Sequence, residues 1–346
     1  MELGSIRGIR VATSAPEVTH LLFADDCIIF VQAKTEETRV IKEILKTYEK
    51  ASGQVVSLEK TIISFSQATR EARRREITDL LGVRCVDVKE KYLGLPIVVG
   101  RSKKILTNTI RDKLWKRLQG WKGMLFSKAG REVLIKAVAQ SIPTYAMSVF
   151  KIPAYFCDEI RKIVSHFWWG QNQGVRKVHW IAWKNLCRPK EFGGLGFQDY
   201  QMFNWALLGK QVWSLCTNEN TLAARVIKGK YYPNSSFLEA QLGRNPSYTW
   251  RGFWEAKWVV EKGLRNRIGD GAITNIWTDA WLSGTNSGKV LSPKPTDCSY
   301  VWVKDLLKPS GLEWDEDNVR SCLLPFEAEK VTSIRISERR PPDEWF

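Results

Sequence analysis

Positive charge and tryptophan are both confined to particular stretches of this chain, and their placement divides it before any fold is considered. Residues 101–190 carry 19 lysines and arginines against 4 acidic side chains, and this surplus of 15 supplies nearly all of the net charge of +16. All 16 tryptophans lie at Trp115 or beyond it. Because large aromatic side chains dominate many cores, a stretch without tryptophan must be packed differently from the rest. The pattern predicts a near-neutral domain over residues 1–98, a basic domain over 99–190 and a tryptophan-rich region over 191–346.

The length of 346 residues and the hydrophobic content of 44% are those of a globular chain of two to three domains. No apolar run reaches the roughly 18 residues that span a bilayer, and the N-terminal residues lack the apolar core of a signal peptide. We therefore expect an intracellular protein of the nucleus or the cytoplasm, with no membrane partner and no secretion. The 7 cysteines contain no C-x-x-C pair, which favours reduced thiols over a disulfide framework or a zinc site.

The first domain alternates strand and helix signals, which is typical of the α+β class. Two apolar, β-prone runs flank Asp25 and Asp26, and this is the pattern of a tight hairpin with carboxylates at its turn. Gly53 can end a preceding helix in the left-handed conformation. The expected elements are helices at 35–52 and 71–81 and extended segments at 55–65 and 92–99.

The basic segment is predicted to be helical. From Lys103 to Gln119, leucine or isoleucine recurs every fourth residue, which gives a helix with one apolar stripe. A second helix is expected over residues 128–140, with Val133, Leu134, Ala137 and Val138 on its buried side. Residues 158–169 are expected to form a third helix. The candidate nucleic-acid-binding cations, largely off the apolar stripes, are Lys103, Lys104, Arg111, Lys113, Lys116, Arg117, Lys122, Lys128, Arg131 and Lys136.

Such cations can simply keep a helix face solvated. A surplus of 15 within residues 101–190 is too concentrated for that explanation alone, so we expect sequence-independent binding to an RNA–DNA or DNA duplex. Trp115 and Trp121 could stack on exposed bases, but their helical spacing favours the core.

Beyond residue 190, a mixed, mainly helical region is expected, with a helix at 204–216 and a hairpin at 267–277 around an Asp-Gly turn.

Asp25 and Asp26 are the candidate catalytic and metal-binding residues. Nucleotidyl transfer uses carboxylates that hold two Mg²⁺ ions about 4 Å apart. A rigid hairpin between apolar strands can present such carboxylates at its turn. The alternative is an ordinary surface turn, in which aspartate is favoured for its conformation alone.

An ordered series of motifs adds a resemblance to a known family. The residues Phe23, Ala24, Asp25 and Asp26 resemble the F-A-D-D box of non-LTR (LINE-type) retrotransposon reverse transcriptases, particularly those of plants. The resemblance continues in order over most of the chain, through 91–96 (KYLGLP), 125–138 (LFSKAGREVLIKAV), 193–197 (GGLGF), 204–208 (NWALL) and 277–281 (WTDAW).

This resemblance implies an RNA-directed DNA polymerase fold: a partial palm over residues 1–98, a duplex-gripping thumb over 99–190 and a connection beyond it. It implies that Asp25 is a catalytic Mg²⁺ ligand with Asp26 beside it. It further implies that Lys60 belongs to the next palm motif and contacts nucleic acid. Finally, it implies that a hairpin resembling the family's primer grip contains Tyr92, Leu93 and Gly94.

The family palm also needs an upstream metal-binding aspartate and a set of fingers. The 19 residues before His20 contain no aspartate. We therefore expect a C-terminal fragment of such a polymerase, inactive alone and with weak or absent Mg²⁺ binding, whose missing palm and fingers another chain could supply. Two alternatives are open: a non-catalytic nucleic-acid-binding module, and a non-functional translated relic that folds poorly.

Overall fold

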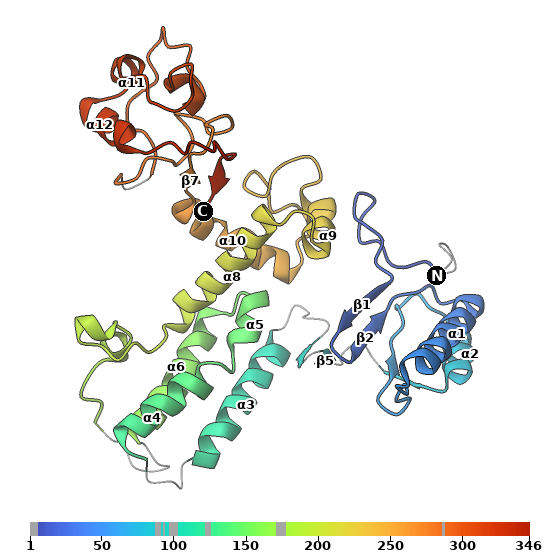
Figure 1. Ribbon diagram of the computed structural model, residues 1–346. Coiled ribbons are helices and arrows are strands. Elements are labelled where there is room, and N and C mark those ends of the chain that lie inside the picture. Colours follow the sequence, from blue (N-terminus) through green and yellow to red (C-terminus); the bar gives the residue numbers. More distant parts are fainter. Residues whose placement is uncertain are drawn as a thin grey trace. The chain divides into compact units, whose positions relative to one another are not determined.

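The computed structural model describes residues 6–86, 91–92, 94–96, 103–121, 126–170, 178–285 and 288–346. Its fold is α+β, as predicted, and every sheet among these residues has two strands (Figure 1). The chain forms two compact units, unit 1 (Met1–Ala256) and unit 2 (Lys257–Phe346). The division into three domains at 98 and 190 stays a prediction.

Unit 1 is mainly helical. Its strands are β1 (His20–Phe23), β2 (Asp26–Ile29), β3 (Ile62–Ile63), β4 (Arg84–Cys85), β5 (Lys91–Tyr92) and β6 (Leu95–Pro96). Its helices are α1 (Thr35–Ser52), α2 (Glu71–Leu81), α3 (Lys104–Trp121), α4 (Lys128–Leu134), the π-helical η1 (Ile135–Ala139), α5 (Thr144–Val149), α6 (Ala154–Trp169), α7 (Trp183–Leu186), the 3₁₀-helical η2 (Lys190–Phe192), α8 (Tyr200–Thr217), α9 (Leu222–Tyr231) and α10 (Tyr248–Gly263), which continues into unit 2.

The N-terminal part of unit 1 follows its local sequence signals. β1 and β2 pair antiparallel with Phe23 opposite Asp26, so the predicted hairpin is confirmed. Helix α1 ends at Gly53, which has a φ of 71° and donates its backbone N–H to the carbonyl of Glu49. This is the left-handed glycine cap that the sequence predicted. Of the expected extended segment 55–65, only β3 forms, and it pairs in parallel with β4.

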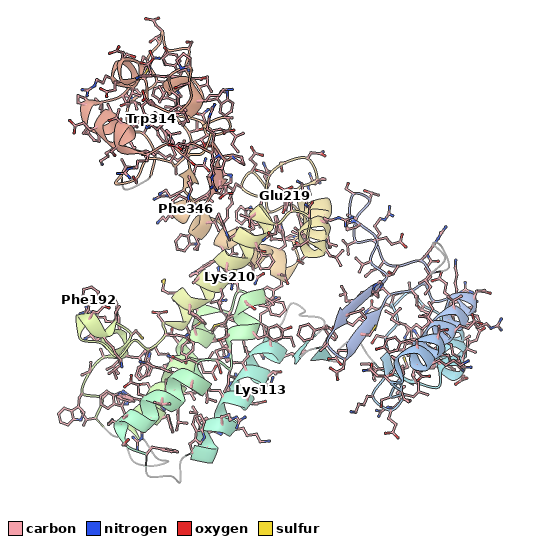
Figure 2. The ribbon with its side chains drawn as sticks, viewed as in Figure 1. Lys113, Phe192, Lys210, Glu219, Trp314 and Phe346 are labelled. Atoms are coloured by element: carbon pink, nitrogen blue, oxygen red, sulfur yellow. The ribbon has the colours of Figure 1, made fainter. Side chains whose placement is uncertain are left out.

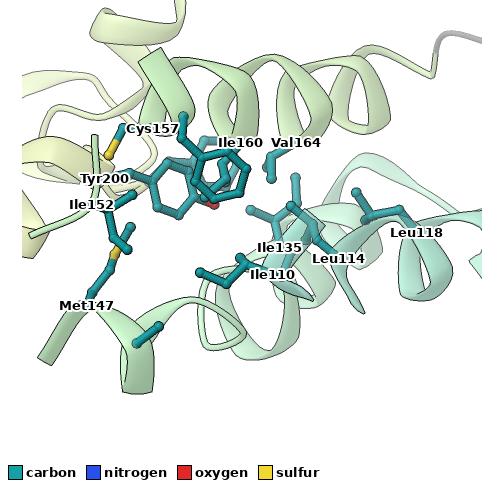
Figure 3. Packing of buried hydrophobic residues seen from close by; sticks show 14 of the residues in the cluster. Ile110, Leu114, Leu118, Ile135, Met147, Ile152, Cys157, Ile160, Val164 and Tyr200 are labelled. Atoms are coloured by element: carbon teal, nitrogen blue, oxygen red, sulfur yellow. The ribbon is translucent and has the colours of Figure 1, made fainter. Parts of the chain in front are cut away.

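The basic helices of unit 1 pack around one apolar core. The predicted stripe on α3 is confirmed, because Leu106, Ile110, Leu114 and Leu118 are all buried. Figure 3 shows Ile110 and Leu114 pointing toward Ile160 of α6, with Ile135 between the helices. Burying a leucine or isoleucine side chain stabilises a fold by about 1.5–3 kcal/mol, so this stripe fixes which face of α3 is turned outward.

The buried side of the second basic helix differs from the prediction. Val133 is 62% exposed and Ala137 is also exposed, whereas Ile135 and Ala139 are buried. The helix changes at Ile135 from α4 to the π-helical turn η1, which inserts an extra residue into the turn and rotates the following side chains. The predicted buried side of this helix was wrong because it was derived from the 3.6-residue period of an uninterrupted α-helix.

The two tryptophans of the basic segment have different surroundings. Trp121 is partly buried and packs against the core, with its ring 5.7 Å from that of Phe167. Trp115 is 46% exposed, so the expectation that both rings are core residues is wrong for it. The difference follows from the helix, because Trp115 lies next to Leu114 and therefore points about 100° away from the buried stripe.

A buried asparagine ties α8 to the segment after α5. Asn204 is 3% exposed, and its side-chain oxygen accepts a hydrogen bond from the backbone N–H of Ile152 at 2.8 Å. Its amide nitrogen donates to the carbonyls of Met147 and Phe150 at 2.7 and 3.0 Å. These three bonds satisfy backbone groups near the end of α5 that would otherwise be buried without partners.

Unit 2 has its own core, which contains Trp314 (Figure 2). The rings of Trp314 and Trp281 stack there with centroids 6.2 Å apart. Its first strand pairs antiparallel with its last, and Arg265 and Phe346 exchange backbone hydrogen bonds at 3.0 and 2.8 Å beside them. The elements of unit 2, besides the end of α10, are β7 (Asn266–Arg267), η3 (Val303–Leu306), α11 (Glu316–Cys322), α12 (Pro325–Ser333) and β8 (Glu344–Trp345).

The hairpin predicted at 267–277 is wrong. β7 pairs with β8 rather than with residues 273–277, and the intervening turn is organised by Asp343. This buried carboxylate accepts hydrogen bonds from the backbone N–H groups of Gly269, Gly271, Ile273 and Thr274 and from the Thr274 hydroxyl, over distances of 2.7 to 3.2 Å. The turn residues are therefore held by a side chain about seventy positions away in sequence, which local turn chemistry does not reveal.

Across the described residues, no helix combines the length and the apolar character that a membrane span requires.

Candidate nucleic-acid interface

Three of the predicted cations form an exposed basic face on α3. Lys113, Lys116 and Arg117 are all exposed, while their neighbours Leu114 and Leu118 are buried. Figure 2 shows Lys113 on α3. Residues spaced by three and four positions lie on the same side of a helix, so these three side chains share one face. Because the apolar stripe is fixed in the core, the basic face is held outward by a rigid element. We call Lys113, Lys116 and Arg117 the α3 basic face.

Other predicted cations are engaged by acidic side chains of the same unit. Arg111 pairs with Glu159 of α6, with its Nε 2.6 Å from the carboxylate. Lys136 donates to Glu132 at 2.7 Å, and Lys190 lies 3.3 Å from the same carboxylate. The hydrogen bond from Lys136, aided by Lys190, holds the pKa of Glu132 below its usual value despite burial. The charges of Arg111 and Lys136 are thus partly compensated within the fold.

Lys128 and Arg131 lie at the C-terminal end of α6. Their side chains donate to the carbonyl of Trp168 at 3.2 and 3.3 Å, in the last turn before the left-handed Gly170. Lys128 also lies 4.7 Å above the rings of Trp168 and Trp169. A helix C-terminus carries partial negative charge and unpaired carbonyls, so both cations stabilise the helix end. This structural role was not visible in the sequence.

The remaining predicted cations do not belong to the α3 basic face. The ammonium of Lys103 lies 3.6 Å from the centre of the Tyr248 ring, and burial together with the charge of Arg251 lowers the pKa of Lys103. Lys104 is exposed in the first turn of α3, and Lys60 is exposed in the turn before β3. Lys122 lies outside the described residues.

The candidate catalytic carboxylates lie at the tip of the β1–β2 hairpin. Asp25 occupies the turn and Asp26 begins β2, and both side chains are exposed. Ala24, which precedes them, has a φ of 50°. A two-residue hairpin turn requires a positive φ at its first central residue, and this conformation costs free energy for a residue with a Cβ atom. The turn therefore presents two carboxylates in a conformation that sequence preference alone does not favour.

These two carboxylates are not joined by further metal ligands in the described part of the chain. Among those residues, no group of three or more His, Cys, Asp or Glu side chains could hold a metal ion. Mg²⁺ accepts a few carboxylates and retains water, but two-metal nucleotidyl transfer needs ligands on both ions. The donor set present in these residues does not assemble such a centre.

The residues predicted to be primer-grip-like lie in a hairpin, in which β5 and β6 pair antiparallel around Gly94. Gly94 has a φ of 80°, and a Cβ atom at this position would lie 3.5 Å from the Lys113 ammonium. Partial burial raises the pKa of the Tyr92 hydroxyl, and the negative charge of Asp26 raises it further. Lys113, Gly94, Tyr92 and Asp26 are thus brought into one region of unit 1. Leu93 lies outside the described residues.

Comparison with known proteins identifies plant relatives. No protein-family model matches the chain. An uncharacterized mitochondrial protein of Arabidopsis thaliana is 39% identical over 143 residues, which cover 41% of this chain and 93% of that protein. The chain therefore belongs to the same family as this mitochondrial protein.

A second relative from the same plant is larger. A protein named as a putative ribonuclease H protein of Arabidopsis thaliana is 31% identical over 238 residues, or 64% of this chain. The match covers only 36% of that relative, so the chain spans about a third of its length.

Proposed function

We propose that this chain derives from a plant transposable element and represents the palm, thumb and connection of a reverse-transcriptase-like protein. Its activity in the 346-residue form is sequence-independent binding of a nucleic-acid duplex. The α3 basic face carries this proposal, because its three cations project from a helix whose opposite side is fixed in the core. Such a row can follow a phosphate backbone without reading bases.

The neighbouring hairpins support a polymerase origin for the binding surface. Lys113 lies beside Gly94, and the charge of Asp26 reaches Tyr92. In a polymerase, cations that hold the duplex must adjoin the carboxylates that act on the primer end. The contact of Lys113 with the β5–β6 hairpin supports such an arrangement. RNA-directed DNA synthesis would need metal ligands beyond Asp25 and Asp26, which a palm and fingers on another chain could supply.

Duplex binding is tested by its dependence on salt. Three phosphate contacts give a slope of about −2.7 in a plot of log affinity against log salt concentration. Raising KCl from about 50 to about 200 mM should therefore weaken binding at least about fortyfold, as measured by the fluorescence anisotropy of short labelled RNA–DNA and DNA duplexes. Two unrelated base sequences should give the same curve. An affinity that does not change with salt would exclude binding through the α3 basic face.

The carboxylate pair gives a second prediction, which separates binding from catalysis. The chain with Mg²⁺ and deoxynucleotides should not extend a DNA primer on an RNA template, because two carboxylates do not complete a two-metal centre. The double variant Asp25→Asn, Asp26→Asn should bind the duplex as tightly as the parent chain, within about twofold, since both side chains are exposed and its loss of negative charge can only favour binding. Primer extension that disappears in this variant would show that the chain is a working polymerase.

A further inference from the structure

Two cysteines of unit 2 lie in contact. The Sγ atoms of Cys298 and Cys322 are 3.5 Å apart, although the residues are 24 positions apart in the sequence. Cys322 is the last residue of α11 and is 8% exposed, whereas Cys298 lies in the preceding loop and is half-buried. We propose that these two thiols form a reversible intramolecular disulfide, which makes this pair a redox modification site in unit 2.

The segments that carry the two thiols are already fixed against each other. The Tyr300 hydroxyl donates to the side-chain oxygen of Asn318 on α11 at 3.0 Å. The indole N–H of Trp277 donates to the Tyr300 carbonyl at 3.0 Å, which holds the loop from its other side. A disulfide has an S–S distance of about 2.0 Å, so the sulfur atoms need to approach by only about 1.5 Å. Side-chain rotation can supply that movement without displacing α11.

The two thiols differ in exposure, and this difference determines which of them reacts first in disulfide exchange. A small disulfide such as oxidised glutathione can reach Cys298 first. The Cys298 thiolate attacks one glutathione sulfur, forms a mixed disulfide and releases one glutathione thiolate, which takes up a proton. Cys322 then loses its proton and attacks the Cys298 sulfur, releasing the second glutathione. Two protein thiols are oxidised, and one small disulfide is reduced to two thiols.

Burial favours this order of attack. It raises the pKa of the Cys322 thiol, and a hydrogen bond from Ser321 opposes that effect only in part. Cys322 is therefore a poor first nucleophile but is correctly positioned to resolve a mixed disulfide on its neighbour. The bond would close a loop that contains both η3 and α11, which contribute residues to the core of unit 2.

The experiment uses the full chain, incubated with reduced and oxidised glutathione, blocked with N-ethylmaleimide and digested with trypsin. Cleavage after Lys289, Lys304, Arg320 and Lys330 places the two cysteines in separate peptides, 290–304 and 321–330. The folded chain should yield these peptides joined, with a mass lower than their sum by two hydrogen atoms, and dithiothreitol should separate them. The bond should also raise the melting temperature of unit 2 by about 5 to 15 °C.

Matched variants make the result specific. Cys298→Ser should abolish both the joined peptide and the oxidation-dependent shift in melting temperature. Cys85→Ser, at an exposed cysteine in β4, should change neither. Recovery of Cys298 and Cys322 only as separate alkylated or glutathionylated peptides, under conditions that oxidise other dithiols, would overturn the proposal. Equal joining of Cys298 to Cys85 would overturn it as well, because it would show random pairing.

Discussion

Replacing Asp343 by alanine is expected to lower the stability of unit 2 by a large part of its total. The carboxylate accepts five hydrogen bonds from Gly269, Gly271, Ile273 and Thr274, and it is only 7% exposed. Hydrogen bonds to charged groups contribute about 1.5–3 kcal/mol each, and buried donors left without partners incur a further cost. Because the contributions are not additive, we expect a loss of about 4 kcal/mol or more in the free energy of unfolding. A unit of this size has about 5–13 kcal/mol in total.

Urea denaturation followed by tryptophan fluorescence measures this effect, since Trp281 and Trp314 stack in the core of unit 2. Glu344→Ala is the matched control, because Glu344 is the adjacent acidic residue and is exposed in β8. It should leave the unfolding midpoint of unit 2 nearly unchanged. An Asp343→Ala chain as stable as this control would contradict the assigned role of the carboxylate.

The same residue gives unit 2 a dependence on pH. Burial opposes ionisation of Asp343, but hydrogen bonds from Gly269, Thr274, Gly271 and Ile273 outweigh it and lower the pKa of the carboxylate. A carboxylate whose pKa is lower in the folded state contributes stability above its unfolded pKa, which is about 3.9. That stability is lost as the pH falls through the lower, folded pKa. The Asp343→Ala variant should therefore lose less stability on acidification than the parent chain.

Removing the α3 basic face is the change expected to affect function most. The triple variant Lys113→Gln, Lys116→Gln, Arg117→Gln should reduce the salt slope of duplex binding by about 2.7, or about 0.9 for each lost phosphate contact. At about 50 mM KCl the affinity should fall at least about a hundredfold. The fold should be retained, because all three side chains are exposed and the buried stripe of α3 is untouched.

A second triple variant controls for net charge. Arg39→Gln, Lys46→Gln, Lys50→Gln removes the same number of positive charges from exposed positions along α1. It should weaken binding only slightly, through the long-range field, and keep most of the salt slope. If both triple variants lowered affinity equally, binding would depend on total charge, and the α3 basic face would have no special role.

The sequence predicted those elements whose signals are local. Helix α1 has acidic Glu36 and Glu37 in its first turn and a glycine at its end, and the predicted and observed bounds agree. The β1–β2 hairpin and the stripe from Leu106 to Leu118 were equally predictable, because each depends on the spacing of neighbouring apolar residues. In these cases the tertiary structure agrees with the local preference of the chain.

Elements that depend on distant residues were not predictable. The turn after β7 is shaped by Asp343, and the side of the second basic helix that is buried depends on the π-helical turn at Ile135.

For the candidate interface, the sequence identified a basic segment. It could not distinguish the cations that stabilise the fold from those that are exposed and available to bind nucleic acid. Lys128 and Arg131 cap α6, and Arg111 pairs with Glu159, whereas Lys113 belongs to the exposed face. That distinction requires the packing of α3 and α4 against α6.

The pairing of β7 with β8 has a consequence for the modularity of unit 2. Because Arg265 and Phe346 exchange backbone hydrogen bonds, the first and last strands of the unit are immediate neighbours. A short linker between Arg265 and Phe346 would therefore join the segment that these strands enclose into a closed loop without disturbing its core, which is the geometry that circular permutation requires. The exposed turn at Pro309 and Ser310 offers a place for the new termini.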